Sequence, residues 1–339
     1  MRRTGTTAAS RPYAAQSEGM APSCFVGARG AGGEHQDGQT ERGQATVVHP
    51  LLQLRPARSE RDGVIGDCLV AQPQYGRFGV TEPLASGSDR PQVMSTRLFS
   101  VVIDAADPRA LGHWWRDALG WEVMYQAPDE VVVVPPNALE VADIPGLVFV
   151  EVNDPKRGKN RVHLDLAAQS PEDQAVIVAR LLAAGATHAD VGQGDDVPWV
   201  VLADPEGNEF CVLDARPRYR GSSALAAIVL DTQDPEALAP FWMAATGRIV
   251  GDEDDEYLSL RHPDGYLPDL ELSRTDDPHT VKNRVHLDVA PWADGDLDEE
   301  VDRLLALGAT RADVGQGDDV TWVVLADPGG NEFCVLRPR

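Results

Sequence analysis

The segment Asn160-Arg161-Val162-His163-Leu164-Asp165 decides the fold, because the chain repeats it unchanged as Asn283-Arg284-Val285-His286-Leu287-Asp288. The offset of 123 residues holds without a gap from 160 to 213, and 39 of these 54 positions are identical in the second copy. Upstream the likeness is weaker: Val101-Val102-Ile103-Asp104 pairs with Ile228-Val229-Leu230-Asp231 at an offset of 127. A long internal repeat of this kind indicates two copies of one structural unit.

The repeat predicts two homologous domains, residues 96–217 and 222–339, which follow a different kind of sequence. Residues 1–95 are rich in Gly, Ser, Gln, Arg and Pro and show neither a helical nor a strand period. Such a composition is typical of a disordered segment, so we expect a disordered leader. A second hypothesis is that the leader is not translated, since Met94 directly precedes the first well-patterned strand and would make an ordinary start.

Composition and charge argue against a protein that binds nucleic acid or a membrane. The chain has 339 residues, of which 42% are apolar, and its formal charge is -24 from 30 Lys+Arg against 54 Asp+Glu. Because phosphate groups repel such a chain, neither nucleic acid nor membrane is expected as a partner. Four cysteines are too few for a disulfide framework, and no secretory signal is evident, so we expect a cytoplasmic protein. Two fused domains resemble a covalent dimer, which leaves both a monomer and a homodimer open.

Each domain divides into two βαβββ halves. In the first half, Asp107 and Pro108 are expected to begin a helix that ends at Gly120. In the second half, Ser170 caps a helix that ends at Gly185. The strands expected in the first domain are 98–103, a segment around 123, 131–134, 147–152, 162–166, 199–203 and 209–213. The pattern predicts an α+β fold.

Side chains alternate across a strand, so Val162 and Leu164 are expected beneath the helix while His163 and Asp165 point the other way. Where the polar faces of several strands meet, the sheet would form a cup that orients a small ligand. The candidate ligand-binding residues are His163, Asp165, Trp199, Glu209 and Cys211 in the first domain and His286, Asp288, Trp322, Glu332 and Cys334 in the second.

Each of these residue types also has an ordinary structural use. The two histidines could simply hydrogen-bond inside the sheet, and the two cysteines could be small buried apolar residues. Glu209 and Glu332 could be solvated or paired with Arg161 and Arg284, and the two tryptophans could fill the interface between domains. Trp114, Trp115 and Trp242 lie on helical stripes and are expected in the core. These alternatives stay open from the sequence.

The motifs together resemble a known family. A strand, Asp-Pro, a helix and Gly, followed by the segment 160–165 and by Asp204-Pro205-Glu206-Gly207-Asn208-Glu209-Phe210-Cys211-Val212, resemble the glyoxalase-like branch of the vicinal oxygen chelate (VOC) superfamily. The resemblance covers nearly all of residues 97–339. It implies tandem glyoxalase/bleomycin-resistance-like domains, each of two βαβββ modules forming a curved mixed sheet with helices outside.

The resemblance also implies a cofactor, because many members hold a divalent metal such as Zn, Ni, Mn or Fe with ligands from the first and last strands of each module. Carried over to this chain, the metal-ligating candidates are His163, Glu209, His286 and Glu332. The matching first-strand positions of the first modules are Ser100 and Ala227, and the last-strand positions fall near Val150 and Ser273. Each domain thus keeps half a site, unless the two second modules pack together so that their four ligands converge.

The function expected from these residues is binding of a small organic molecule in a sheet-lined cup, without a complete metal site. One alternative is a metal-dependent lyase, isomerase or dioxygenase of the same superfamily. A second alternative is a non-catalytic regulatory or interaction module, because fold alone does not give function. The sequence therefore leaves open whether the chain is an enzyme.

Overall fold

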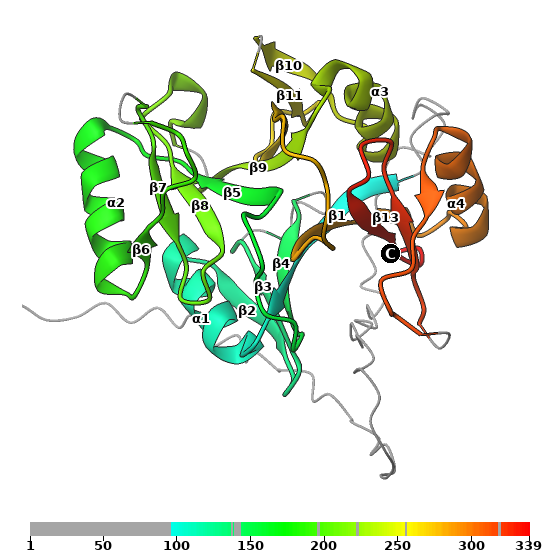
Figure 1. Cartoon of the computed structure of the whole chain (residues 1–339), viewed down its shortest axis with the longest axis horizontal. Coiled ribbons are helices and arrows are strands. Elements are labelled where there is room, and N and C mark those ends of the chain that lie inside the picture. The colour runs from blue at the N-terminus through cyan, green and yellow to red at the C-terminus, as the bar shows by residue number, and fades with distance from the viewer. Residues whose placement is uncertain are drawn as a thin grey trace, which may run out of the picture. The chain divides into compact units, whose positions relative to one another are not determined.

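The structure, a computed structural model of the chain, describes residues 96–136, 138, 144–194, 197–221, 224–254, 256–317 and 320–339 (Figure 1). The expected leader and the expected start at Met94 lie outside the described residues. Among the described residues, no helix has the length and apolarity needed to cross a membrane.

Four βαβββ modules follow one another along the chain. The first holds β1 (Thr96–Ala105), α1 (Pro108–Leu119), β2 (Glu122–Gln126), β3 (Glu130–Val134) and β4 (Gly146–Glu151). The second holds β5 (Val162–Leu166), α2 (Pro171–Ala183), β6 (Thr187–His188), β7 (Val200–Ala203) and β8 (Glu209–Val212), followed by the short helix η1 (Pro217–Tyr219). The third holds β9 (Leu225–Thr232), α3 (Pro235–Thr246), β10 (Ile249–Glu253), β11 (Tyr257–Arg261) and β12 (Asp269–Arg274). The fourth holds β13 (Val285–Pro291), α4 (Leu297–Ala306), β14 (Thr310–Arg311), β15 (Val323–Ala326) and β16 (Glu332–Val335).

The helix ends follow the expected local chemistry. Asp107 caps α1 by accepting a hydrogen bond from the Ala110 amide, and Gly120 ends the helix with a φ of 66°. That left-handed conformation favours glycine, which has no Cβ to clash. Ser170 caps α2 in the same way, accepting from the Asp173 amide. The sequence therefore predicts both helix starts correctly.

The strands form two eight-stranded mixed sheets. One, here called the His286 sheet, has the order β14-β15-β16-β13-β1-β4-β3-β2, and the other, the His163 sheet, has the order β10-β11-β12-β9-β5-β8-β7-β6. This confirms the predicted fold class. The partnership of the modules differs from the prediction, because each sheet joins one module of each copy through the antiparallel pairs β1–β13 and β5–β9.

The two modules of one copy are instead joined through their helices. On α1, Trp114 and Trp115 pack edge to face against Phe210 of β8, and the Trp115 indole donates a hydrogen bond to Asp204 before β8. The second copy repeats the arrangement with Phe241, Trp242, Phe333 and Asp327. This confirms the predicted core role of Trp115 and Trp242, whereas Trp114 is half-buried and packs against the core from outside. Since helix-side packing uses the faces and not the edges of β1 and β5, those edges are free to pair with the other copy.

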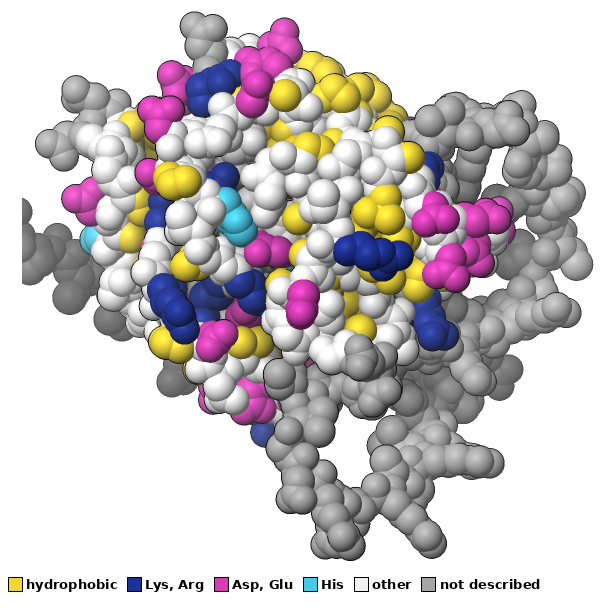
Figure 2. Space-filling model, turned by 45° about the vertical axis from the view of Figure 1, so that its right-hand side comes forward, with side chains coloured by type: hydrophobic (Ala, Val, Ile, Leu, Met, Phe, Trp, Pro, Cys, Tyr) yellow, Lys and Arg dark blue, Asp and Glu magenta, His cyan; other side chains and the backbone are white. Residues whose placement is uncertain are grey.

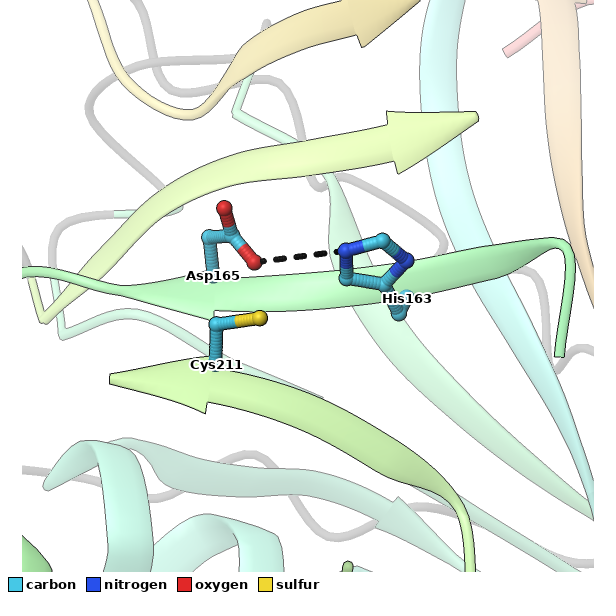
Figure 3. A group of neighbouring side chains, drawn as sticks. All are labelled: His163, Asp165 and Cys211. Carbon is cyan, nitrogen blue, oxygen red and sulfur yellow. Dashed lines mark ion pairs between the residues drawn. The ribbon is translucent and has the colours of Figure 1, made fainter. Parts of the chain in front are cut away.

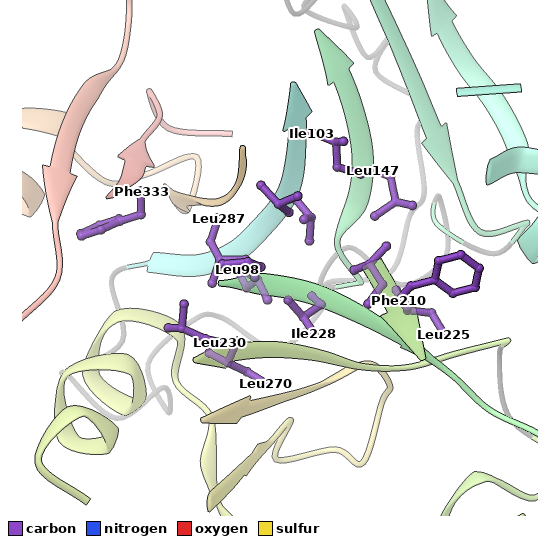
Figure 4. Close-up of a cluster of buried hydrophobic side chains, with 14 of the residues drawn as sticks. Leu98, Ile103, Leu147, Phe210, Leu225, Ile228, Leu230, Leu270, Leu287 and Phe333 are labelled. Atoms are coloured by element: carbon purple, nitrogen blue, oxygen red, sulfur yellow. The ribbon is translucent and has the colours of Figure 1, made fainter. Parts of the chain in front are cut away.

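A single apolar core fills the helix side of both sheets. It includes Ile103 and Leu147 from the first module, Phe210 from the second, Ile228 from the third and Leu287 from the fourth, which Figure 4 shows converging from several strands. The expected burial of Val162 and Leu164 is confirmed, and Leu166 of the same strand face is buried with them. Three smaller apolar clusters lie on the opposite faces of the sheets, which we call the cup faces, and these faces carry the histidines.

Candidate functional site

Two equivalent clusters of polar side chains lie on the two cup faces. In the His163 sheet, β5 supplies His163 and Asp165, which share a face because they are two residues apart. Cys211 of β8 is the register partner of Asp165. Figure 3 shows the three side chains on the two neighbouring strands, and one donor atom of each lies within 4.8 Å of the others. The His286 sheet repeats the cluster with His286, Asp288 and Cys334.

Asp165 is the least compensated member of its cluster. It is 6% exposed, and its Oδ1 atom accepts no hydrogen bond among the described residues. The approach of 3.6 Å between His163 Nε2 and this Oδ1 is too long for one. Burial, followed by the charge of Glu271, raises the pKa of Asp165 to about 8, although a hydrogen bond with Cys211 acts in the opposite direction. With a pKa near 8, Asp165 favours the protonated acid near neutral pH.

Asp288 is equally buried but has one more partner. The Ser100 hydroxyl on β1 donates a hydrogen bond to Asp288 Oδ2 at 2.9 Å. Burial still dominates and raises the pKa of Asp288 to about 7, against the lowering effect of the bonds from Ser100 and Cys334. Its Oδ1 atom, like that of Asp165, accepts no hydrogen bond among the described residues.

The two imidazoles are neutral at physiological pH. Burial lowers the pKa of His163, with Asp231 and Glu209 acting in the opposite direction and Lys159 in the same one. Burial and then the charge of Lys282 lower the pKa of His286 to about 3. A neutral imidazole has a free lone pair, which can accept a hydrogen bond or bind a metal.

The donor set of each cluster fits a divalent transition metal. Imidazole nitrogen, carboxylate oxygen and sulfur suit Zn or Fe better than Mg or Ca. The buried Oδ1 atoms of Asp165 and Asp288 lack a partner, which a bound cation would provide. When bound, such a metal supplies Lewis-acid stabilisation of a developing oxyanion. Three protein donors are the number found in open, catalytic zinc sites, so His163, Asp165 and Cys211 could hold a metal, as could His286, Asp288 and Cys334.

The two glutamates expected near the histidines make other contacts. Glu209 Oε1 accepts from Lys156 Nζ at 2.6 Å, and Glu209 Oε2 accepts from the Asn160 amide at 3.2 Å. Glu332 likewise accepts from the Asn283 amide at 3.2 Å, and its Oε2 lies 3.2 Å from His279 Nε2. Glu209 thereby binds the segment that precedes β5, and Glu332 binds the segment that precedes β13. Their role as metal ligands stays a prediction.

The expected ion partners of these glutamates instead connect the two copies. Arg161 donates to Asn331 Oδ1 at 3.1 Å and to the main-chain oxygen of Asp277 at 2.8 Å. Arg284 donates to Asn208 Oδ1 at 3.1 Å and to Glu206 Oε2 at 2.7 Å. The contacts to the two asparagines are equivalent, whereas Glu206 corresponds to Gly329 in the second copy, so its ion pair has no counterpart there.

The arrangement in which both second modules would share one site is not formed. His163 and His286 lie in different sheets, each beside a first module of the other copy. Val162 and Val285, which flank the histidines, both belong to the helix-side core, so the histidines point away from that core. The four candidates His163, Glu209, His286 and Glu332 therefore do not converge.

The other candidates lie beside the clusters. Trp199 packs against the apolar cluster that contains Cys211 and Tyr219, and Trp322 packs against the cluster that contains Cys334. Both cysteines are buried thiols outside any disulfide, with exposures of 8% and 7%. The tryptophans thus lie on the cup side, while contact with a ligand stays a prediction.

Sequence reasoning missed Glu271 and Ser259, which reach the His163 face because β9 of the second copy pairs with β5. Register pairs place His163, Val229, Glu271 and Ser259 in one row across β5, β9, β12 and β11. The signal was present, because alternation in the segment 269–274 puts Asp269, Glu271 and Ser273 on one face. This alternation did not place Glu271 near His163, because the sequence does not show which copy supplies the module that pairs with β5.

A cavity of about 610 Å³ lies elsewhere, between the segments 154–161 and 277–284 that precede β5 and β13. Its lysines are already paired with buried acids, because Lys159 Nζ contacts Asp231 and Lys282 Nζ contacts Asp104, each at 2.6 Å. Figure 2 shows Lys and Arg side chains gathered around a hollow on the face drawn, with acidic side chains at several separate places. The polar clusters of the two cup faces lie outside the lining of this cavity, so it is separate from the candidate site.

Paired βαβββ modules with polar clusters on the cup faces of two eight-stranded sheets define the class of protein. The chain belongs to the family of the glyoxalase-like domain, whose sequence profile matches residues 100–213 and again residues 227–336. The two matches confirm the tandem arrangement. A search of curated protein sequences finds no match to the chain.

Solved structures agree at the level of the fold. Glyoxalase I from Zea mays is similar with a TM-score of 0.50 and 15% sequence identity, covering 72% of this chain and 92% of the other. A mutant of glyoxalase I from the same plant gives a TM-score of 0.50 and 14% identity, covering 72% and 94%. At this identity the likeness extends to the fold alone.

Proposed function

We propose that the chain binds a small organic molecule on its cup faces, with the His163 face as the principal site. The observation that carries the proposal is the buried carboxylate oxygen of Asp165, which lacks a hydrogen-bond partner among the described residues and lies beside a neutral imidazole. Burying such an atom is costly unless something binds it. A ligand group or a proton would supply the missing partner.

Residues beside the cluster support a small ligand with an apolar part. Val201, Cys211 and Tyr219 form a buried cluster on the cup side, and the partly buried Trp199 packs against it. Aromatic and aliphatic walls with a few polar groups are typical of small-molecule sites. Tyr219 belongs to the short helix η1 after β8, so this helix packs against the cup side through Tyr219.

The test is a melting-temperature screen of the full chain, in the presence of EDTA, against a panel of small aromatic and aliphatic molecules. A ligand that binds the folded state raises the melting temperature. We expect ligands whose effect disappears in His163→Ala and persists in the matched variant His286→Ala. If no molecule of the panel raises the melting temperature, or if His163→Ala leaves every effect unchanged, the proposal fails.

A metal-dependent enzyme of the same superfamily is the second candidate, and the three-donor clusters favour it. Its test is loading of metal-free protein with Co²⁺, because cobalt bound to a thiolate gives an intense near-ultraviolet charge-transfer band. Two bound ions are expected, with half of the band lost in Cys211→Ser and half in Cys334→Ser. A protein that binds no Co²⁺ at either cluster would contradict this candidate.

A further inference from the structure

The two cup faces carry the same histidine cluster but different neighbours, which gives a matched pair within one chain. In the His163 sheet the row beside the histidine reads Val229, Glu271 and Ser259. In the His286 sheet the equivalent row reads Val102, Val148 and Val132. One face therefore has a carboxylate and a hydroxyl where the other has two valines.

Ser259 is a second unpartnered polar group on the His163 face. It is 2% exposed, and its hydroxyl oxygen forms no hydrogen bond among the described residues. Because it is the direct register partner of Glu271, both side chains lie on the same face of neighbouring strands. Together with Asp165 Oδ1, the face holds two buried oxygens that lack partners within the described chain.

The acids of this face outnumber the cations available to them. Asp269 is bound by Arg218 at 2.6 Å, Asp231 is bound by Lys159, and Arg261 contacts Asp252. Arg216 is the cation that acts on both Asp165 and Glu271, and it is shared with Asp214 at 3.1 Å. Asp165 and Glu271 thus face each other's charge, with Arg216 acting on both acids and Arg261 acting on Glu271 as well.

The space between these two acids is lined by small residues. The strand that separates β5 from β12 is β9, which presents Ala227 beside Asp165 and Val229 beside Glu271. Short side chains there leave no bulky group of β9 between the two carboxylates, and Glu271 is half-buried, so the face is open to solvent beside Glu271. An ammonium group has three donors and no acceptor, which complements a set of carboxylate and hydroxyl oxygens.

We infer that the His163 face selects a small organic amine, whose ammonium group binds between Asp165 and Glu271 beside Ser259. The inference rests on the proposed function and names its ligand class. The carbon part of the amine packs toward the apolar cluster of Tyr219 and Trp199, where an aromatic ring also favours a nearby cation. The His286 face has valines at the equivalent positions, and its own buried acid is Glu130, whose charge acts on Asp288, so Glu130 is the residue to compare with Glu271.

The experiment compares benzylamine with benzyl alcohol, a neutral molecule of similar shape, by isothermal titration calorimetry of the full chain in EDTA. We expect one benzylamine per chain and binding of the alcohol weaker by about tenfold or more, since a charge-assisted hydrogen bond is stronger than a neutral one. Glu271→Gln keeps the size and removes the charge, so it should abolish the preference. Glu130→Gln, which alters a buried acid of the other sheet, should leave it intact.

Ser259→Ala provides a second variant, because it removes a hydroxyl that forms no hydrogen bond among the described residues and should fold at least as stably as the natural chain. We expect it to weaken benzylamine binding by about threefold or more. If benzyl alcohol binds as tightly as benzylamine, or if Glu271→Gln retains the preference, the inference is overturned. Ligands from the broader panel that still depend on His163 would then show that small-molecule binding survives without the amine preference. A panel without any ligand would overturn both.

Discussion

The indole of Trp115 donates a hydrogen bond to Asp204 Oδ2 at 3.0 Å, although 89 residues separate them. Trp242 and Asp327 form the same bond at 3.0 Å in the second copy. Each bond joins the first helix of a copy to the turn that precedes its last strand. The two modules of a copy are thus held together by helix-side packing, while their sheets are completed by the other copy.

Removing this indole donor should destabilise the fold. In Trp115→Phe the ring packing against Phe210 is largely kept, but the buried carboxylate of Asp204 loses a donor. We expect a loss of about 1–3 kcal/mol in the free energy of unfolding, measured by urea denaturation. Trp242→Phe should cost a similar amount, and the two losses should add, because the sites are independent. An unchanged midpoint would show that the bond carries no net stability.

The exchange of modules predicts that one copy cannot fold alone as a monomer. A chain of residues 96–221 keeps the helix-side contacts but loses the pairs β1–β13 and β5–β9. Two long strands would then expose unpaired edges, which favours association. We expect this fragment to form a homodimer, or to stay unfolded until residues 224–339 are added. A stable folded monomer in sedimentation equilibrium would contradict the prediction.

The buried acids predict a stability that falls as pH rises. The pKa of Asp165 is about 8 in the folded chain, far above its ordinary value of 3.8, so the unfolded chain releases this proton at lower pH. Its contribution is therefore fully present below about pH 4 and is lost as pH rises to about 8. Asp165→Asn should raise the stability at pH 8 by about 2 kcal/mol and have little effect at pH 4.

The same measurement on Asp288→Asn provides a comparison. Since the pKa of Asp288 is about 7 in the folded chain, its contribution to the free energy of unfolding should be lost as the pH rises to about 7. His286 has the opposite effect, because its pKa is about 3 in the folded chain and 6.5 is its ordinary value. As the pH falls below 6.5, the unfolded chain binds this proton first, so the stability decreases. Urea unfolding in EDTA between pH 4 and pH 8 checks both. A pH profile that is identical in the natural chain and Asp165→Asn would contradict this account.

The local structure could be predicted because its causes are local. Asp107 and Ser170 cap helices through their own neighbours, and alternation alone places His163 opposite the core residue Val162. Only part of the His163 site could be predicted, namely the residues that β5 and β8 supply. Glu271 belongs to it because β9 of the second copy pairs with β5, and that choice depends on long-range packing between edges that look equivalent in sequence.

The ion pair between Lys282 and Asp104 provides a last prediction, because it joins the two copies across the module exchange. Asp104 is 5% exposed, and its carboxylate lies 2.6 Å from Lys282 Nζ. Burial raises the pKa of Asp104, while Lys282 and then Arg284 lower it, so the lysine favours the ionised acid. In Lys282→Met the acid stays buried without this cation, and we expect a loss of about 2 kcal/mol at pH 8.

The loss should shrink toward pH 4, where the acid takes up a proton and no longer needs the cation. The double variant Lys282→Met with Asp104→Asn should recover most of the stability, because it removes both charges together. Lys159→Met with Asp231→Asn is the matched pair of variants at the reciprocal contact, where Lys159 of the first copy lies 2.6 Å from Asp231 of the second. Urea denaturation of the four single and two double variants measures the coupling. If the single and double variants of one pair lose equal stability at pH 8, the pair does not hold the copies together.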